Sequence, residues 1–148
     1  MDCDQVHERL WLFVGARPDD GTEPADAGFT MIVTTAGKGL GWWPNRDKTK
    51  SAPLHLHFGL TDDAFEIVRG DLERASAAMF AVVSELCQRG KVLVTCSQGL
   101  NRSGWVAAWA IVRLTGISGA AAIEQVQKRR TGSLYNHFFC EHLKGLSP

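Results

Sequence analysis

Three consecutive aliphatic residues, at positions 92–94, constrain the fold of this chain more than any other feature. They lead into a short polar loop that runs from Cys96 to Arg102, and a helical pattern begins at Ser103. A strand that is apolar at every position must be covered on both faces, which is typical of a parallel sheet packed between helices. We therefore predict that residues 92–94 form the central strand of an α/β domain, with the loop at the strand's carboxyl end.

The rest of the chain alternates between strand-like and helix-like segments, without an internal repeat. Short apolar runs predict further strands at residues 10–14, 29–34 and 54–58. Helical spacings predict helices at residues 22–27, 63–89, 103–114 and 118–130 and from Asn136 onward. Gly90 is expected to end the long helix, and Ser118 to cap the one that follows it. The expected fold is one α/β domain over residues 1–148, with a small, mainly parallel sheet flanked by helices on both faces.

The composition disfavours nucleic-acid binding and membrane spanning. With 148 residues, of which 45% are hydrophobic, the chain can bury one sizeable core. Lys+Arg and Asp+Glu each number 16, and this neutral balance argues against a nucleic-acid partner. No apolar run approaches the roughly 20 residues needed to span a bilayer. The N-terminus lacks the basic start and apolar core of a signal peptide, so we expect a cytoplasmic protein.

Cysteine spacing and one irregular stretch bear on metal binding and on loop function. The four cysteines are scattered and form no Cys-x-x-Cys pair, so we expect no zinc site, and no metal or organic cofactor. Residues 36–53 carry three glycines and two prolines together with Trp42 and Trp43. Loops of this length are often functional, and these tryptophans either pack under the loop or line the mouth of a site.

The loop after the central strand has the features of a phosphate-binding loop. Because a helix follows it, its backbone N–H groups lack helical partners, and the helix dipole favours an anion there. Gly99 lets the backbone curl where a side chain would clash. The guanidinium of Arg102 can bind two phosphate oxygens at once. The residues expected to hold phosphate are Ser97, Gln98, Gly99, Leu100, Asn101 and Arg102.

Cys96 is expected to lie beneath such a phosphate as a nucleophile. Helix N-termini and nearby cations lower the pKa of a cysteine thiol from its usual value of about 8.5. A thiolate in line with the P–O bond attacks phosphorus and forms a thiophosphoryl intermediate. The hydroxyl of Ser103 can hydrogen-bond the sulfur and help it leave. The alternative is a buried structural cysteine beside a helix cap, but the strand, the glycine and the helix around it favour the phosphate loop.

The chain resembles the cysteine-dependent protein phosphatases, and within them the compact dual-specificity phosphatases. The family signature is His-Cys-x5-Arg followed by Ser or Thr, and residues 96–103, CSQGLNRS, match all of it after the histidine. Residues 10–16, 28–33 and 122–138 look like the family's opening strands and closing helices. The departure is Thr95, where the family has a histidine that stabilises the thiolate. We therefore expect the pKa of Cys96 to be lowered less than in histidine-bearing relatives.

The resemblance also implies a general acid, an aspartate on a loop about thirty residues before the cysteine, which protonates the leaving oxygen. Asp62 and Asp63 lie in that window, and the counting favours Asp62. Asp63 is then a cap of the following helix or a residue at the substrate rim. Arg130 matches a basic rim position of many relatives, where it would contact a second phosphate or an acidic group of the substrate. Otherwise it lies at a solvated helix end. Asn136 is expected to brace the cysteine loop or to cap the last helix.

Together these residues predict the hydrolysis of phosphomonoesters through a cysteinyl-phosphate intermediate. The leading substrates are phosphotyrosine and phosphoserine or phosphothreonine of proteins, so the expected partner is a phosphorylated protein or peptide. Three alternatives stay open. One is a phosphoinositide phosphatase. The second is an RNA 5′-triphosphate phosphatase, suggested by Gly99-x-Asn101-Arg102-Ser103. The third is a phosphate-binding pseudophosphatase, which Thr95 keeps open.

Overall fold

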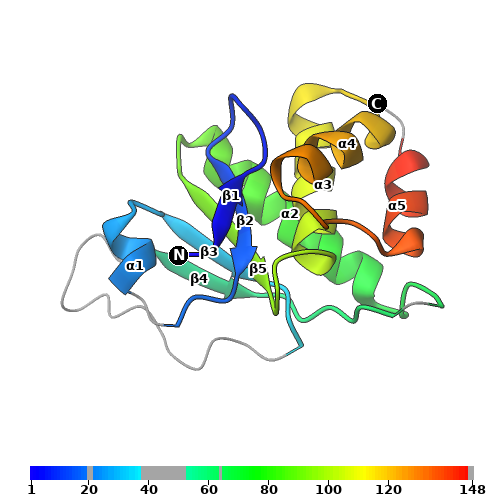
Figure 1. Ribbon diagram of the computed structural model, residues 1–148, viewed down its shortest axis with the longest axis horizontal. Helices are drawn as coiled ribbons and strands as arrows, with labels where there is room; N and C mark the ends of the chain where they lie inside the picture. Colours follow the sequence, from blue (N-terminus) through cyan, green and yellow to red (C-terminus); the bar gives the residue numbers. More distant parts are fainter. Residues whose placement is uncertain (20–21, 38–52, 64, 147–148) are drawn as a thin grey trace.

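The computed structural model describes residues 1–19, 22–37, 53–63 and 65–146 (Figure 1). Its sheet consists of β1 (Cys3–Gln5), β2 (Leu12–Ala16), β3 (Met31–Thr34), β4 (Leu54–His57) and β5 (Val92–Cys96). The strand order is β1-β2-β5-β3-β4, and all pairs are parallel except the antiparallel β1–β2 pair. The predicted small, mainly parallel sheet with residues 92–94 at its centre is thereby confirmed.

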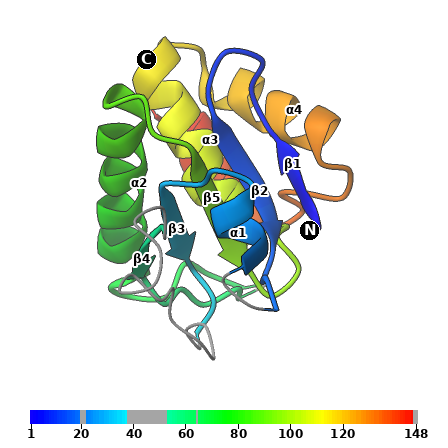
Figure 2. The same ribbon diagram turned by 90° about the vertical axis from the view of Figure 1, so that its left-hand side faces the viewer.

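In the described residues, five helices accompany the sheet: α1 (Thr22–Asp26), α2 (Asp71–Cys87), α3 (Arg102–Thr115), α4 (Gly119–Arg129) and α5 (His137–Lys144). The four longer helices gather on one side of the sheet, and the short α1 lies on the opposite face (Figure 2). No helix in the described part of the chain is long and apolar enough to cross a membrane. The larger helical layer therefore covers one face of the strand that leads into the cysteine loop.

The central strand is buried on both faces, as its apolar sequence predicts. Val92 and Val94 belong to the main core, which also contains the fully buried Trp105 of α3. Leu93 alternates to the opposite face. There it is paired with Phe13 of β2. The rings of Phe13 and Phe29 pack edge to face, with their centroids 5.2 Å apart. With no exposed residue, β5 holds its carboxyl end, and the loop that follows, in a fixed position.

Gly99 lets the cysteine loop pack against β2, and Gly15 lets the segment of Asp2 and Cys3 pack against β2. Gly99 has a φ of 69°, and a Cβ added there would lie 2.2 Å from the carbonyl carbon and oxygen of Gly15. A Cβ on Gly15 would lie 2.5 Å from the Asp2 oxygen.

The strand predicted at residues 10–14 lies two residues later, with Gly15 inside it rather than after it. The short edge strand β1 was not predicted, because its polar residues show no apolar alternation.

The long helix begins eight residues later than its periodicity predicts. The pattern predicted a helix over residues 63–89, whereas α2 starts at Asp71. Gly70 is its N-cap, with a left-handed φ of 86° that interrupts a helical path. Phe65, expected on the buried helix face, lies in the preceding loop and is 85% exposed. Residues 65–70 therefore precede the helix instead of forming its first turns.

Two other helix ends test further expectations. Ser118 caps α4 as predicted, since its hydroxyl accepts the Ala121 N–H at 3.1 Å. The left-handed residue after α2 is Arg89 (φ 64°) rather than Gly90. Gly90 is needed for space, because a Cβ there would lie 2.5 Å from the Glu85 side chain. The tryptophans at 42 and 43 lie outside the described residues.

Candidate active site

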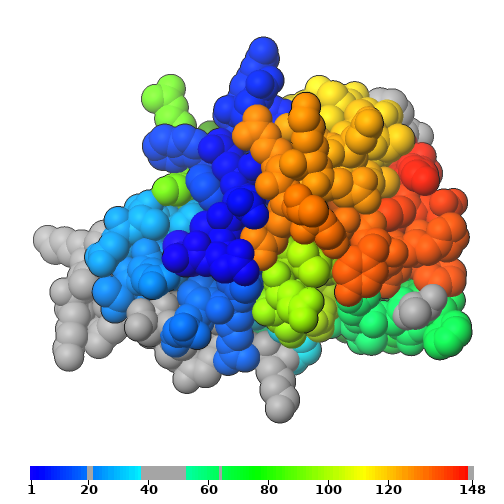
Figure 3. All heavy atoms as spheres, viewed as in Figure 1, coloured from blue at the N-terminus to red at the C-terminus, as the bar shows by residue number. Residues whose placement is uncertain are grey.

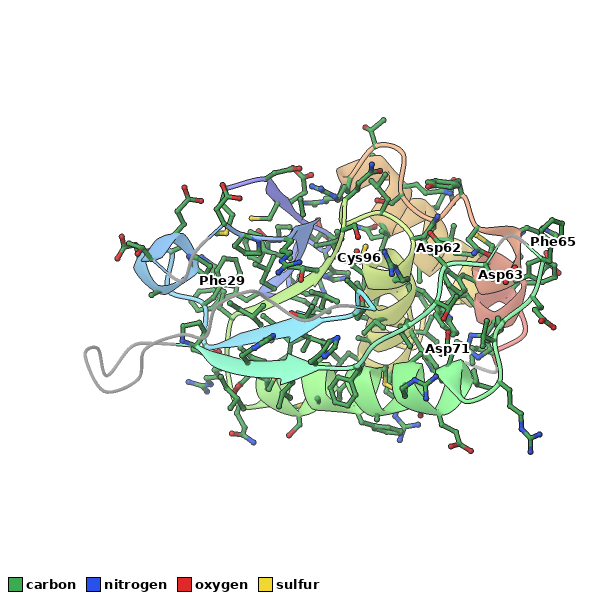
Figure 4. The ribbon with its side chains drawn as sticks, turned by 90° about the horizontal axis from the view of Figure 1, so that it is seen from below. Phe29, Asp62, Asp63, Phe65, Asp71 and Cys96 are labelled. Carbon is green, nitrogen blue, oxygen red and sulfur yellow. The ribbon has the colours of Figure 1, made fainter. Side chains whose placement is uncertain are left out.

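A pocket of about 240 Å³ lies where β5 ends. It is lined by Asp62, Cys96, Ser97, Gln98, Leu100, Asn101, Arg102 and Tyr135. The structure thus brings the predicted nucleophile, the predicted phosphate loop and the predicted acid to one place. Figure 4 shows Cys96 at the start of the loop, with Asp62 on the neighbouring strand-to-helix connection.

The thiol of Cys96 is buried, with 4% of the residue exposed. Its Sγ lies 3.2 Å from the Ser103 hydroxyl oxygen. Burial alone raises the pKa of Cys96, but hydrogen bonds from the Ser103 hydroxyl and from the backbone N–H groups of Ser103 and Leu100, together with the Arg102 charge, lower it below its ordinary value. The thiolate is therefore stabilised at the base of the pocket, as a nucleophile requires.

The guanidinium of Arg102 lies across the loop from the thiol. Its Nη2 donates to the Ser97 hydroxyl at 3.2 Å, and its Nη1 donates to the Leu60 carbonyl at 3.2 Å. Its Nε is buried without a hydrogen-bond partner among the described residues. A buried donor of this kind favours an anion in the pocket, and phosphate oxygens satisfy a guanidinium well.

The carboxylate of Asp62 is held by two side-chain amides. Nδ2 of Asn101 donates to one oxygen at 2.9 Å, and Nδ2 of Asn136 donates to the other at 2.7 Å. The two asparagines are also joined, since the Asn136 N–H donates to Asn101 Oδ1 at 3.0 Å. Asn136 in addition caps α5 by accepting the Phe138 and Phe139 N–H groups. The two tasks expected for Asn136 as alternatives are therefore both present.

The side chain of Asn101 makes a contact with Asp62 that the sequence did not reveal. We expected only its backbone amide to serve the phosphate loop, yet its side chain is buried and bridges the loop to Asp62. The contact joins residues 39 positions apart in sequence. The signal in the sequence was a side-chain amide directly before the arginine. In the structure this amide makes no helix-cap hydrogen bond, which leaves it for Asp62.

Asp63 does not cap a helix, because α2 begins only at Asp71. Its carboxylate instead accepts the Phe65 N–H at 2.7 Å within a local turn, and its carbonyl accepts from Asn136 at 2.9 Å. Asp63 is also not among the residues that line the pocket in the described chain. Of the two aspartates, Asp62 is the one that lines the pocket together with Cys96.

Thr95 supports the loop through its backbone. Its carbonyl accepts both the N–H of Thr35, at 2.7 Å, and the hydroxyl of Thr35, at 2.8 Å. Its own Oγ1 is buried and has no hydrogen-bond partner in the described part of the chain. The threonine that replaces the family histidine therefore gives the thiolate neither a charge nor a hydrogen bond from its side chain.

Arg130 lies behind the phosphate loop and is only 5% exposed, so the expected solvated helix end is wrong. Its Nε and Nη2 donate to the carbonyls of Gly99 and Gln98, at 2.6 and 2.8 Å. Its Nη1 donates to Asp2 and Asp4 at 3.0 and 2.9 Å. Burial lowers the pKa of Arg130, but these carboxylates raise it above its ordinary value. Figure 3 shows the N-terminal segment against the residues near position 130, beside the loop.

The side chains at this site can supply three chemical tasks: nucleophilic attack, binding of oxyanions and proton transfer. No three His, Cys, Asp or Glu side chains gather as possible metal ligands in the described residues. The pocket holds a group suited to each task, namely Cys96, Arg102 with the loop amides, and Asp62. That the reaction needs no cofactor stays a prediction.

Several solved structures with similar folds carry phosphatase names, and one is named a tyrosine phosphatase-like serine/threonine/tyrosine-interacting protein. Human DUSP28 superposes with a TM-score of 0.77 at 23% identity, over 97% of this chain and 91% of that chain. A mouse putative dual specificity phosphatase complexed with zinc tungstate gives a TM-score of 0.72 at 26% identity, over 96% and 84%. Tk-PTP in its active form gives 0.76 at 20% identity, over 97% and 96%. No protein-family model and no curated protein matches the sequence.

These likenesses show that the chain has the compact dual-specificity phosphatase fold. The resemblance carried by residues 96–103 is thereby confirmed at the level of the fold.

Proposed function

We propose that this protein hydrolyses phosphomonoesters through a cysteinyl-phosphate intermediate on Cys96, with phosphotyrosine and phosphoserine or phosphothreonine of proteins as its substrates. The observation that carries the proposal is one pocket in which the buried Cys96 thiol lies 3.2 Å from Ser103 and faces the same space as Arg102 and Asp62. The names of the structural neighbours support it.

In the first step the Cys96 thiolate attacks phosphorus. The S–P bond forms as the P–O bond of the ester breaks. Asp62 gives its proton to the leaving oxygen, so that an alcohol or phenol departs instead of an alkoxide or phenoxide. Arg102 and the loop amides bind the remaining phosphoryl oxygens, whose charge they stabilise in the transition state.

In the second step water attacks the thiophosphate. Asp62, now ionised, accepts a proton from the water as the water oxygen bonds to phosphorus. The P–S bond breaks, and its electron pair returns to the Cys96 sulfur. The Ser103 hydroxyl, 3.2 Å away, donates to the sulfur as it regains negative charge. Inorganic phosphate then leaves, and the starting thiolate is restored.

The contacts of Arg130 and Asn101 bear on the alternative substrates. Arg130 is engaged by two loop carbonyls and two carboxylates, so it offers no free cation to a second phosphate of a phosphoinositide. Asn101 in Gly99-x-Asn101-Arg102 has a task within the protein, because it holds Asp62. A single phosphate of a protein side chain is therefore the substrate that we favour over a polyanionic one.

Turnover on a panel of substrates tests the proposal. We expect release of phosphate from p-nitrophenyl phosphate and from phosphotyrosine, phosphoserine and phosphothreonine peptides, and slower release from phosphoinositides and triphosphate RNA. Cys96→Ser should abolish turnover while phosphopeptide binding persists. Activity that survives in Cys96→Ser would overturn the mechanism. Phosphopeptide binding without any turnover by the intact protein would favour the pseudophosphatase.

A further inference from the structure

Two side chains in the first turn of α2 reach back to the backbone that precedes Asp62. The Asp71 carboxylate accepts the Thr61 N–H at 2.7 Å. Arg74 Nε donates to the Gly59 carbonyl at 3.0 Å, and its Nη2 donates to Asp71 at 2.5 Å. Figure 4 places Asp71 at the end of α2 that lies beside the loop of Asp62 and Asp63. An ion pair on a helix thus holds both sides of Leu60.

The placement of Asp71 differs from that of an ordinary helix cap. The N-cap residue is Gly70, and no side chain bonds the helix start there. The Asp71 carboxylate instead reaches an amide ten residues back, and the residue is 1% exposed. A buried carboxylate is costly unless it is paired and hydrogen-bonded. Both of its oxygens have such a partner, in Thr61 and Arg74.

The segment between these contacts is also held from the side of the pocket. The Leu60 N–H donates to the Thr35 carbonyl at 2.9 Å, and the Leu60 carbonyl accepts from Arg102 at 3.2 Å. The backbone of residues 59–61 therefore has hydrogen bonds to Thr35, which directly follows β3, and to side chains of the phosphate loop and of α2. Asp62 follows directly, so the position of its carboxyl group depends on this segment.

We propose that Asp71 and Arg74 are positioning residues for proton transfer by Asp62, although neither lines the pocket. The inference rests on the proposed role of Asp62 as general acid. Small displacements of a catalytic group reduce its rate contribution strongly, since a misplacement of about 1 Å can cost about 10²-fold. Loosening of Thr61 or Gly59 should therefore weaken the transfer of the proton while the thiol and the phosphate loop keep their geometry.

The test compares two leaving groups. Phenol ionises near pH 10, as tyrosine does, and so needs a proton on departure, whereas p-nitrophenol is far more acidic and needs it much less. The quantity measured for the parent and each variant is kcat/KM. It reports the steps up to formation of the thiophosphate and excludes the hydrolysis of that intermediate. We expect Asp71→Asn and Arg74→Gln to lower kcat/KM for phenyl phosphate by about tenfold, and that for p-nitrophenyl phosphate by much less. Glu73→Gln, an exposed carboxylate of the same turn, is the matched control and should change neither value.

Combination with Asp62→Asn separates positioning from a general effect on the fold. A residue that acts through Asp62 has nothing left to position once the acid is gone, so Asp71→Asn should have no further leaving-group-dependent effect in that background. Arg74→Gln gives the same comparison through a partly exposed side chain and serves if Asp71→Asn folds poorly.

The outcomes are distinct. Equal losses on both substrates, or a loss that persists undiminished in Asp62→Asn, would overturn the positioning role of Asp71 and Arg74. If Asp62→Asn itself lowers kcat/KM equally for both substrates, the proposed acid is wrong. If Asp62→Asn discriminates between the substrates but Asp71→Asn and Arg74→Gln do not, only the present inference fails.

Discussion

The side-chain amide of Asn136 donates a hydrogen bond of 2.7 Å to the carboxylate of Asp62, across 74 residues of sequence. The same side chain starts α5, because its oxygen accepts the N–H groups of Phe138 and Phe139. Asn101 holds the other oxygen of Asp62. The loop that carries Asp62, the phosphate loop and α5 are thereby joined at one carboxylate. Substitutions can separate the effects of the individual contacts.

Asn136→Asp should impair catalysis while it keeps the helix cap. Aspartate caps helices as well as asparagine does, so α5 should keep its cap, although repulsion between the two neighbouring carboxylates should lower the melting temperature. The new carboxylate cannot donate to Asp62 and repels its charge. Asp62 gains negative charge as it gives up its proton, so the transition state loses a hydrogen bond to a charged group, worth about 1.5–3 kcal/mol, and kcat/KM for phenyl phosphate should fall by about tenfold or more. Asn136→Ser, which caps without a charge, should lose less. A fully active Asn136→Asp would show that this contact is dispensable.

Ser103→Ala should raise the pH at which Cys96 reacts. The Ser103 hydroxyl lowers the pKa of Cys96 by its hydrogen bond, so its removal raises that pKa and leaves less thiolate at neutral pH. The midpoint of alkylation by iodoacetamide should therefore move to higher pH. Cys87 is exposed, so Cys87→Ser is the background for the measurement.

The matched control for that titration is Ser118→Ala, which removes a hydroxyl that caps α4 and should leave the midpoint unchanged. An unchanged midpoint in Ser103→Ala would instead assign the thiolate's stability to the backbone N–H groups and to Arg102. The thiolate of the parent should form below the ordinary pKa of cysteine but above that of phosphatases that carry the family histidine.

Thr95→Val should stabilise the protein. The hydroxyl of Thr95 is buried without a hydrogen-bond partner in the described residues, and an unsatisfied buried polar group costs about 1–3 kcal/mol. Valine has nearly the same shape and lacks that group. We expect a gain of about 1 kcal/mol, which raises the melting temperature of a domain of this size by about 2–4 °C. The alkylation midpoint of Cys96 should not move. A lower melting temperature would show that the hydroxyl stabilises the fold, and a raised midpoint would show that it serves the thiolate.

The parts of the site that could be predicted from sequence are those fixed by local geometry. Cys96, Arg102 and Ser103 lie on one strand–loop–helix unit, where spacing determines which side chains meet. Gly99 was likewise predictable, since a curled loop excludes a side chain. Asp62 was reached through the family's spacing, and the structure places it in the same pocket.

The contacts that the sequence did not reveal join segments far apart in the chain. Asn101 reaches Asp62 over 39 residues, and Arg130 reaches Asp2 over 128. The late start of α2 was missed because Phe65 and Val68 extend its apolar period, while Gly70 and the Asp71 contact to Thr61 determine where it begins. In each case tertiary contacts override a local pattern.

Arg130→Met should disturb the phosphate loop from behind. Methionine fills similar space but leaves the carbonyls of Gln98 and Gly99 without their donor, and leaves Asp2 beside Asp4 without the cation between them. Loss of one partner from a buried ion pair costs about 3–5 kcal/mol. Because these two carboxylates are partly exposed, we expect about 2 kcal/mol of stability to be lost, measured by urea unfolding, together with weaker binding of inorganic phosphate. Replacement of both aspartates by asparagine keeps the acceptors and should cost less on both counts. Unchanged phosphate binding in Arg130→Met would show that the loop amides hold their geometry without the arginine.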